Sequence, residues 1–145
     1  MGWLIGQIAE KTGLTTHTLR YYEKAGLMPF VKKSGSGLRV YTESDLEWLN
    51  LIDCLKSTGM SLKDIKQYMD WVQEGDKTLE NRAQMFQKRR KAVEEEIKKL
   101  QGCLEKLDFK IAYYAAAKKY GESHVFERDL KLKAQKAKLF PKVKS

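Results

Sequence analysis

Residues 5–27, which read IGQIAEKTGLTTHTLRYYEKAGL, decide the fold. In residues 5–11 the apolar side chains recur at positions i, i+3 and i+4, a spacing that predicts a short amphipathic helix. Gly13 follows at a position where a helix can end in a left-handed turn. A second helix is expected over residues 16–24, and Gly26 ends it. Two short helices joined by a turn that contains glycine are typical of a helix-turn-helix.

The spacing of three residues within this stretch supports the same interpretation. Ala9 lets the two helices approach each other, Gly13 permits the tight turn, and Leu19 fills the space between the helices. Leu19 and Tyr22 lie three positions apart, on one face of the second helix. We therefore expect both side chains in the core.

The next stretch, residues 28–41, favours strands rather than helices. Pro29 blocks a helix, and the residues on either side of the Ser-Gly-Ser-Gly segment at 34–37 favour strands. This pattern predicts a two-stranded wing with a flexible tip. The wing would present three basic side chains, those of Lys32, Lys33 and Arg39.

Three further helices are expected after the wing. The first starts at Thr42 or Ser44 and ends at Gly59, and the second starts near Ser61 and ends at Gly75. The third carries an a/d heptad repeat over five heptads, about 54 Å of helix. No other segment is long enough to cover this apolar seam, so a homodimer is predicted. The seam consists of Leu79, Ala83, Phe86, Arg90, Val93, Ile97, Leu100, Leu104, Leu107, Ile111 and Tyr114.

The net charge of +9 is unevenly distributed along the chain. Residues 1–42 carry +4, residues 43–76 carry −5, residues 77–117 carry +4 and residues 118–145 carry +6. A basic first unit followed by an acidic segment is expected when only the first unit touches phosphate. A lysine-rich end is more often a solvated or frayed end than a second binding site.

Composition and motifs exclude several classes of protein. No run of about eighteen apolar residues and no secretion signal occurs, so we expect a cytoplasmic protein without a membrane anchor. Cys54 and Cys103 are too few for a disulfide framework. Paired carboxylates, a nucleophile with a base and a phosphate-binding glycine loop are all missing, so neither an enzyme nor a cofactor is expected.

Three motifs together resemble the MerR family of bacterial regulators. They are Thr-Leu-Arg-Tyr-Tyr-Glu at residues 18–23, Arg-Val-Tyr at residues 39–41 and Gly-Met-Ser-Leu-Lys-Asp-Ile at residues 59–65. The resemblance covers residues 4–72. It implies a mainly helical protein with a winged helix-turn-helix DNA-binding domain over residues 1–75.

The resemblance also implies an assembly and a mechanism. The helix over residues 76–116 would pair with a second copy as an antiparallel coiled coil, followed by a basic C-terminal tail over residues 117–145. The homodimer would bind an inverted repeat in double-stranded promoter DNA. It would bend and untwist the overlong promoter spacer, and so activate transcription by RNA polymerase.

The resemblance assigns DNA-binding roles to residues of the second helix and of the wing. His17 departs from the arginine that is common in the family, and a neutral histidine donates only one hydrogen bond. Leu38 replaces a frequent tyrosine. The predicted DNA-binding residues are Thr16, His17, Arg20 and Tyr21 on the recognition helix, and Lys32, Lys33, Arg39 and Tyr41 on the wing.

Cys54 is the candidate sensor. Relatives that sense metals carry several cysteines near residues 77–79 and 120–124, where this chain has none, so no metal site is expected. Cys54 occupies the position of the single cysteine in a subgroup that responds to thiol and aldehyde stress. Its thiolate would react with an electrophile near a positive charge, supplied by Lys56 or by a basic residue of the partner's dimer helix such as Arg89 or Arg90.

Three alternatives stay open at the level of the sequence. Cys54 could be a buried structural thiol. The regulator could respond to a small molecule or a protein without cysteine chemistry. A protein of a different class, a coiled-coil protein that binds nucleic acid loosely, would use only the seam and the basic segments.

Overall fold

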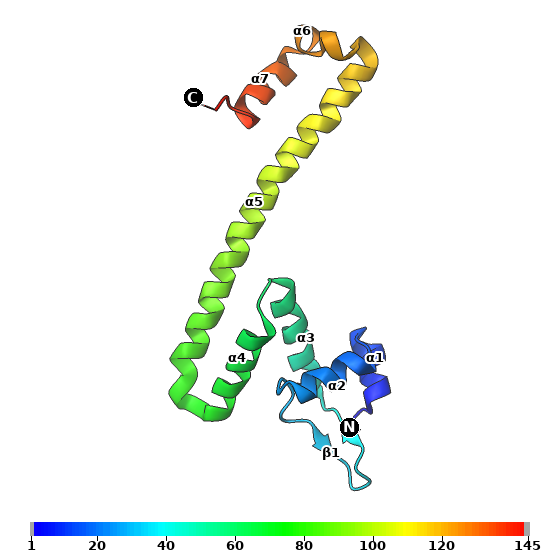
Figure 1. The fold of residues 1–145 in the computed structure, drawn as a ribbon, viewed down its shortest axis with the longest axis vertical. Coiled ribbons are helices and arrows are strands. Elements are labelled where there is room, and N and C mark those ends of the chain that lie inside the picture. The colour runs from blue at the N-terminus through cyan, green and yellow to red at the C-terminus, as the bar shows by residue number, and fades with distance from the viewer. Residues whose placement is uncertain (1, 144–145) are drawn as a thin grey trace. The chain divides into compact units, whose positions relative to one another are not determined.

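The computed structural model describes residues 2–143 and forms two compact units that divide between residues 90 and 91. Helices dominate both units, and the only strands among the described residues form a small two-stranded sheet. The predicted fold class, mainly helical with a winged helix-turn-helix and a long helix, is confirmed (Figure 1).

The first unit begins with the predicted helix pair, α1 (Ile5–Thr12) and α2 (Thr16–Lys24). Gly13 ends α1 with a φ of 73°, a conformation that costs side chains with a Cβ atom. The Thr15 hydroxyl then caps α2 by accepting a hydrogen bond from the Thr18 backbone N–H at 3.0 Å. These two local features fix the angle at which the second helix leaves the first.

The wing follows as an antiparallel pair, β1 (Lys32–Lys33) and β2 (Arg39–Val40). Its tip is closed by a hydrogen bond from the Ser34 backbone N–H to the Leu38 carbonyl at 2.6 Å. An isolated bridge between Trp3 and Tyr41 joins the wing to the residues before α1. The wing is therefore attached to the helical core at its base.

Two helices complete the core of the first unit, α3 (Glu43–Ser57) and α4 (Leu62–Glu74), followed by the short 3-10 helix η1 (Gly75–Thr78). Thr42 and Asp45 form a reciprocal capping box at the start of α3. The most deeply buried side chains of this core are Ile8, Leu19, Tyr22, Leu27, Tyr41, Leu49, Ile52 and Ile65.

The long helix α5 (Leu79–Tyr120) begins in the first unit. Met85 and Phe86 pack against the core, and the Phe86 ring meets the Tyr68 ring edge-on at 5.0 Å. Most of the predicted seam beyond this point is uncovered. The exposed fraction is 50% for Ile97, 55% for Leu100, 57% for Leu104 and 70% for Ile111.

The second unit contains the later part of α5, the 3-10 helix η2 (Glu122–His124) and two helices, α6 (Val125–Arg128) and α7 (Leu130–Leu139). Its small core joins Phe109 of α5 to Val125 of α6 and Leu132 of α7. The sequence alone left the conformation of residues 118–145 open. In the structure α5 continues to Tyr120, after which residues 121–143 turn back and α7 packs on α5 (Figure 1).

Within residues 2–143, no helix combines the length and the apolar composition that a membrane span requires.

Candidate nucleic-acid interface

One face of α2 points away from the core. Successive residues of an α-helix are rotated by about 100°, so Arg20 lies roughly on the opposite side from Leu19 and Tyr22 taken together. Leu19 and Tyr22 are 0% and 2% exposed, which confirms their predicted place in the core. The exposed face carries three of the predicted DNA-binding residues, His17, Arg20 and Tyr21, with Thr16 half-buried at its edge.

Lys24 belongs to the same face of α2, although the sequence analysis did not single it out. It is exposed and lies four residues after Arg20, so the two side chains are neighbours on the helix surface. The i, i+4 spacing from Arg20 is the signal that identifies it. Lys24 extends the positive charge of the exposed face of α2 by one turn.

The wing presents its predicted cations on both strands. Lys32 and Lys33 are exposed on β1, and the Arg39 side chain on β2 is 39% exposed. Leu38, at the end of the tip, is 56% exposed. The wing thus offers two exposed lysines and the ion-paired guanidinium group of Arg39 close to the exposed side chain of Leu38.

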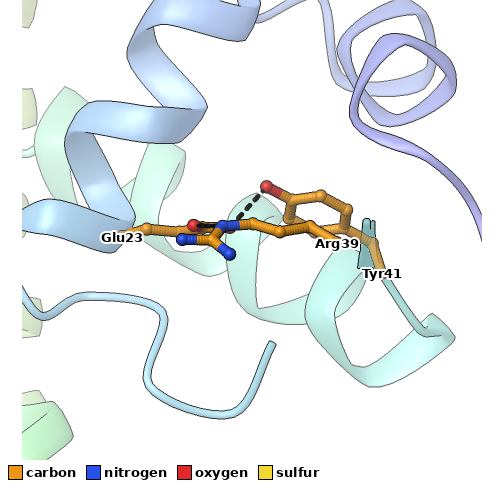
Figure 2. A network of polar contacts seen from close by, with 3 residues as sticks. All are labelled: Glu23, Arg39 and Tyr41. Atoms are coloured by element: carbon orange, nitrogen blue, oxygen red, sulfur yellow. Dashed lines mark hydrogen bonds and ion pairs between the residues drawn. The ribbon is translucent and has the colours of Figure 1, made fainter. Parts of the chain in front are cut away.

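Glu23 connects the recognition helix to the wing (Figure 2). Its carboxylate accepts a hydrogen bond from Arg39 Nε in an ion pair, and another from the Tyr41 hydroxyl at 2.7 Å. The Glu23 side chain is only 10% exposed, so the two contacts replace water around its charge. Glu23 was part of the motif in the sequence, but its role depends on contacts 16 and 18 residues away.

The prediction that Tyr41 contacts DNA does not fit the structure. Tyr41 is 0% exposed, and its hydroxyl donates a hydrogen bond to Glu23 rather than lying at the surface. Its ring lies in the hydrophobic core of the first unit. Tyr41 therefore acts as a buried support for Glu23 and Arg39.

A cleft of about 840 Å³ lies between α1, α2 and the wing. Leu4 and Leu38 form parts of its apolar walls, and its charged lining consists of two arginines, Arg20 and Arg39, and two glutamates, Glu10 and Glu23. Within residues 2–143 the Arg20 side chain makes no hydrogen bond or ion pair, whereas Arg39 is held by Glu23.

Cys54 is exposed on α3, so it is not a buried structural thiol in this chain. The ammonium group of the nearby Lys56 contacts Tyr22. Lys56 Nζ donates to the Tyr22 hydroxyl at 3.0 Å and lies 5.3 Å from the centre of the Tyr22 ring. Arg89 reaches the end of α3 from the same chain and donates to the Thr58 carbonyl at 3.2 Å.

Replacing Tyr41 by Phe tests the buried support. Burial raises the pKa of the Tyr41 hydroxyl above its ordinary value of 10.0, and the Arg39 charge offsets part of that rise. The hydroxyl therefore stabilises the fold fully below pH 10.0, and this contribution is lost as the pH rises through the higher folded value. Tyr41→Phe should lower the free energy of unfolding at pH 7 by about 1.5–3 kcal/mol.

The difference in the free energy of unfolding between wild type and Tyr41→Phe should be constant from about pH 7 to 9. It should shrink as the pH rises above the ordinary tyrosine pKa. Denaturant titration followed by tryptophan fluorescence measures it, because Trp3, Trp48 and Trp71 all lie in the first unit. Tyr21→Phe is the control, since that side chain is 50% exposed. Equal stability of Tyr41→Phe and wild type would refute the role given to the hydroxyl.

Two family models match the chain. The model described as MerR HTH family regulatory protein matches residues 4–71, and the model described as MerR, DNA binding matches residues 46–108. The first match covers the helix-turn-helix, the wing, α3 and nearly all of α4. The second covers most of α3, all of α4 and much of α5.

Similar proteins and structures agree with these models. An HTH-type transcriptional regulator of Haemophilus influenzae is 43% identical over 121 residues, which are 83% of this chain and 90% of the relative. The regulator AdhR of Bacillus subtilis is 45% identical over 78 residues, 54% of this chain and 56% of AdhR.

Among solved structures, HiNmlR is a MerR family regulator that lacks the sensor domain and was crystallised bound to promoter DNA. It superposes with a TM-score of 0.79 at 43% identity, over 83% of this chain and 96% of HiNmlR. A MerR family regulator from Bacillus thuringiensis gives a TM-score of 0.71 at 39% identity, over 77% of this chain and 98% of that protein.

The two family models and the identity shared over nearly all of the Haemophilus influenzae regulator lead to one conclusion: the chain belongs to the MerR family of helix-turn-helix DNA-binding transcription regulators.

Proposed function

We propose that this regulator binds an inverted repeat in double-stranded promoter DNA as a homodimer and distorts the DNA between the half-sites. The observation that carries the proposal is the solvent-facing surface of α2, which is tied to the basic wing through Glu23. The crystal structure of HiNmlR on promoter DNA supports the choice of partner.

In this proposal each part of the surface has its own task. Arg20 and His17 contact base edges in the major groove, where arginine recognises guanine with two hydrogen bonds. Thr16 and Tyr21 lie at the margins of the same face. Lys32, Lys33 and Arg39 bind phosphates from the wing and fix the register of α2 on the duplex.

The uncovered seam of α5 supports the homodimer. The apolar side chains of Ile97, Leu100, Leu104, Leu107 and Ile111 are all at least 50% exposed in the single chain. Contiguous apolar surface of this length is typical of an interface. The heptad spacing fits an antiparallel coiled coil with a second copy, which places two recognition helices on one DNA molecule.

A dimer that holds two half-sites can bend and untwist the DNA between them. The deformation costs free energy, and the contacts made by both protomers supply it. Such a change in a promoter spacer brings the two promoter boxes into a relation that RNA polymerase can engage. The regulator would then act as an activator through the DNA.

Arg20→Ala tests the DNA-binding surface. Removal of a bidentate base interaction should weaken binding by about 1–3 kcal/mol per half-site, roughly 5- to 150-fold. Fluorescence anisotropy on the inverted repeat that wild type recovers by in vitro selection measures the affinity. Footprinting upstream of its own gene should show the same repeat inside a promoter spacer.

Lys98→Ala is the matched control, because it removes one positive charge from an exposed position of α5 outside the seam. We expect it to bind like wild type. If Arg20→Ala bound the repeat as tightly as Lys98→Ala, the recognition face would be misassigned. If wild type selected no repeat, site-specific binding itself would be disproved.

Cys54 is proposed as the sensor of electrophilic stress. Its thiol is exposed, as a reactive cysteine must be. With an aldehyde, the thiolate sulfur would bond to the carbonyl carbon while the carbonyl oxygen takes up a proton. The added group would lie on α3, whose opposite side packs in the same core as Leu19 and Tyr22 of α2.

Cys54→Ser tests the sensor in cells exposed to formaldehyde or methylglyoxal. The variant should bind DNA like wild type but lose promoter activation by the aldehyde. Cys103→Ser, which removes the other exposed thiol, should respond normally. A normal response of Cys54→Ser would reject cysteine sensing and point to a small-molecule or protein signal.

A further inference from the structure

We propose that helix α7 carries a second DNA-contact surface, which binds phosphates outside the sequence read by α2. The surface is defined here as the lysine face of α7, made of Lys131, Lys133, Lys136 and Lys138. This inference rests on the proposed DNA-binding function, but it concerns another unit of the chain. It assigns a binding role to a segment whose lysine-rich sequence is more typical of a solvated or frayed end.

The charge of the segment is unbalanced. Residues 130–143 contain five lysines and no aspartate or glutamate. Within residues 2–143, none of these lysines forms an ion pair with a carboxylate. The repulsion between these charges weakens the helix unless a polyanion neutralises it.

The lysine face is part of an ordered helix rather than a loose tail. Asp129 caps α7 by accepting a hydrogen bond from the Leu132 backbone N–H at 3.0 Å. Leu132 is 4% exposed and packs with Val125 and Phe109. Lys136 Nζ lies 4.8 Å from the centre of the Phe126 ring, which holds that side chain in place.

The arrangement around the helix suits a nucleic-acid backbone. With Leu132 facing the core, the outward side of α7 carries Leu130, Ala134 and Ala137, all exposed. Lys131 and Lys138 flank this strip on one side and Lys133 flanks it on the other, whereas Lys136 lies closer to the packed side, over the Phe126 ring. The alanines allow close approach, and lysines about 10 Å apart along the axis reach separate phosphates.

The same arrangement argues against a lipid surface. Helices that lie in a membrane interface bury a broad strip of large apolar side chains. The outward strip of α7 offers one leucine, Leu130, and two alanines. DNA is therefore the polyanion that the surface fits, and it is already the partner of the first unit.

The proposed antiparallel dimer brings the surface to the DNA. In an antiparallel pair, the end of α5 in one protomer lies beside the start of α5 in its partner. The start of α5 belongs to the unit that contains α2 and the wing. The lysine face of one protomer would then lie near the flank of the half-site that its partner reads.

The test replaces Lys131, Lys133 and Lys138 together by Gln, which keeps helix propensity and removes three charges. Anisotropy measures the affinity of the full chain between about 50 and 300 mM salt, on the selected repeat with long flanks and on a nonspecific duplex. The slope of log K against log salt should become shallower by about 0.9 for each phosphate that the variant no longer neutralises. The expected change is about 2 when each protomer releases at least one phosphate.

The matched control replaces Lys88, Lys91 and Lys98 by Gln, three exposed lysines of α5 outside the seam. A slope change no larger than that of the control would overturn the proposal. So would an unchanged slope combined with weaker dimerisation or weaker transcription, which would indicate a protein contact. If wild type selected no repeat, the proposed function would fail, and the nonspecific duplex would still test the lysine face.

Discussion

The apolar seam of α5 leaves a long strip of large apolar side chains exposed in the single chain. It runs along a helix of 42 residues, and its exposed leucines and isoleucines find no cover within the described chain. Phe109 lies two residues from Leu107 and from Ile111, and two residues along a helix correspond to about 200°, so Phe109 faces away from the seam. That side is already packed against α6 and α7. The seam is thus the side left for a second copy, and pairing there would set the distance between two recognition helices.

The proposed DNA-binding surface of one chain depends on a second, local connection. A wing of two short strands is weakly held by its own hydrogen bonds. Glu23 attaches the wing to α2 through its ion pair with Arg39, and the hydroxyl of buried Tyr41 donates a hydrogen bond to the Glu23 carboxylate. The charge of Arg39 is consequently held close to α2, and the guanidinium groups of Arg20 and Arg39 line one cleft together with the carboxylates of Glu10 and Glu23. A change in the position of α2 would therefore also move the wing.

The sequence predicted the elements whose patterns are local. The Ala9, Gly13 and Leu19 spacing located the helix pair, and the heptads located α5. It could not distinguish Tyr41 from a surface residue, because the burial of that ring depends on packing between the wing and the helices. It also missed the fold of residues 122–139, where few apolar residues are spread among many lysines and only Val125 and Leu132 are buried. Exposure of Cys54 likewise follows from the orientation of α3, which Leu49, Ile52 and Leu55 determine by facing the core.

Sedimentation equilibrium of Leu104→Glu tests whether a second copy covers the seam. Leu104 is 57% exposed in the single chain, so the substitution costs the isolated protomer little, whereas in a coiled coil it places a charge in the apolar seam. Lys99→Glu, at an exposed position outside the seam, is the control. We expect twice the mass of the chain for wild type and Lys99→Glu, and the mass of one chain for Leu104→Glu. A monomeric wild type, or a Leu104→Glu dimer as stable as the control, would contradict it.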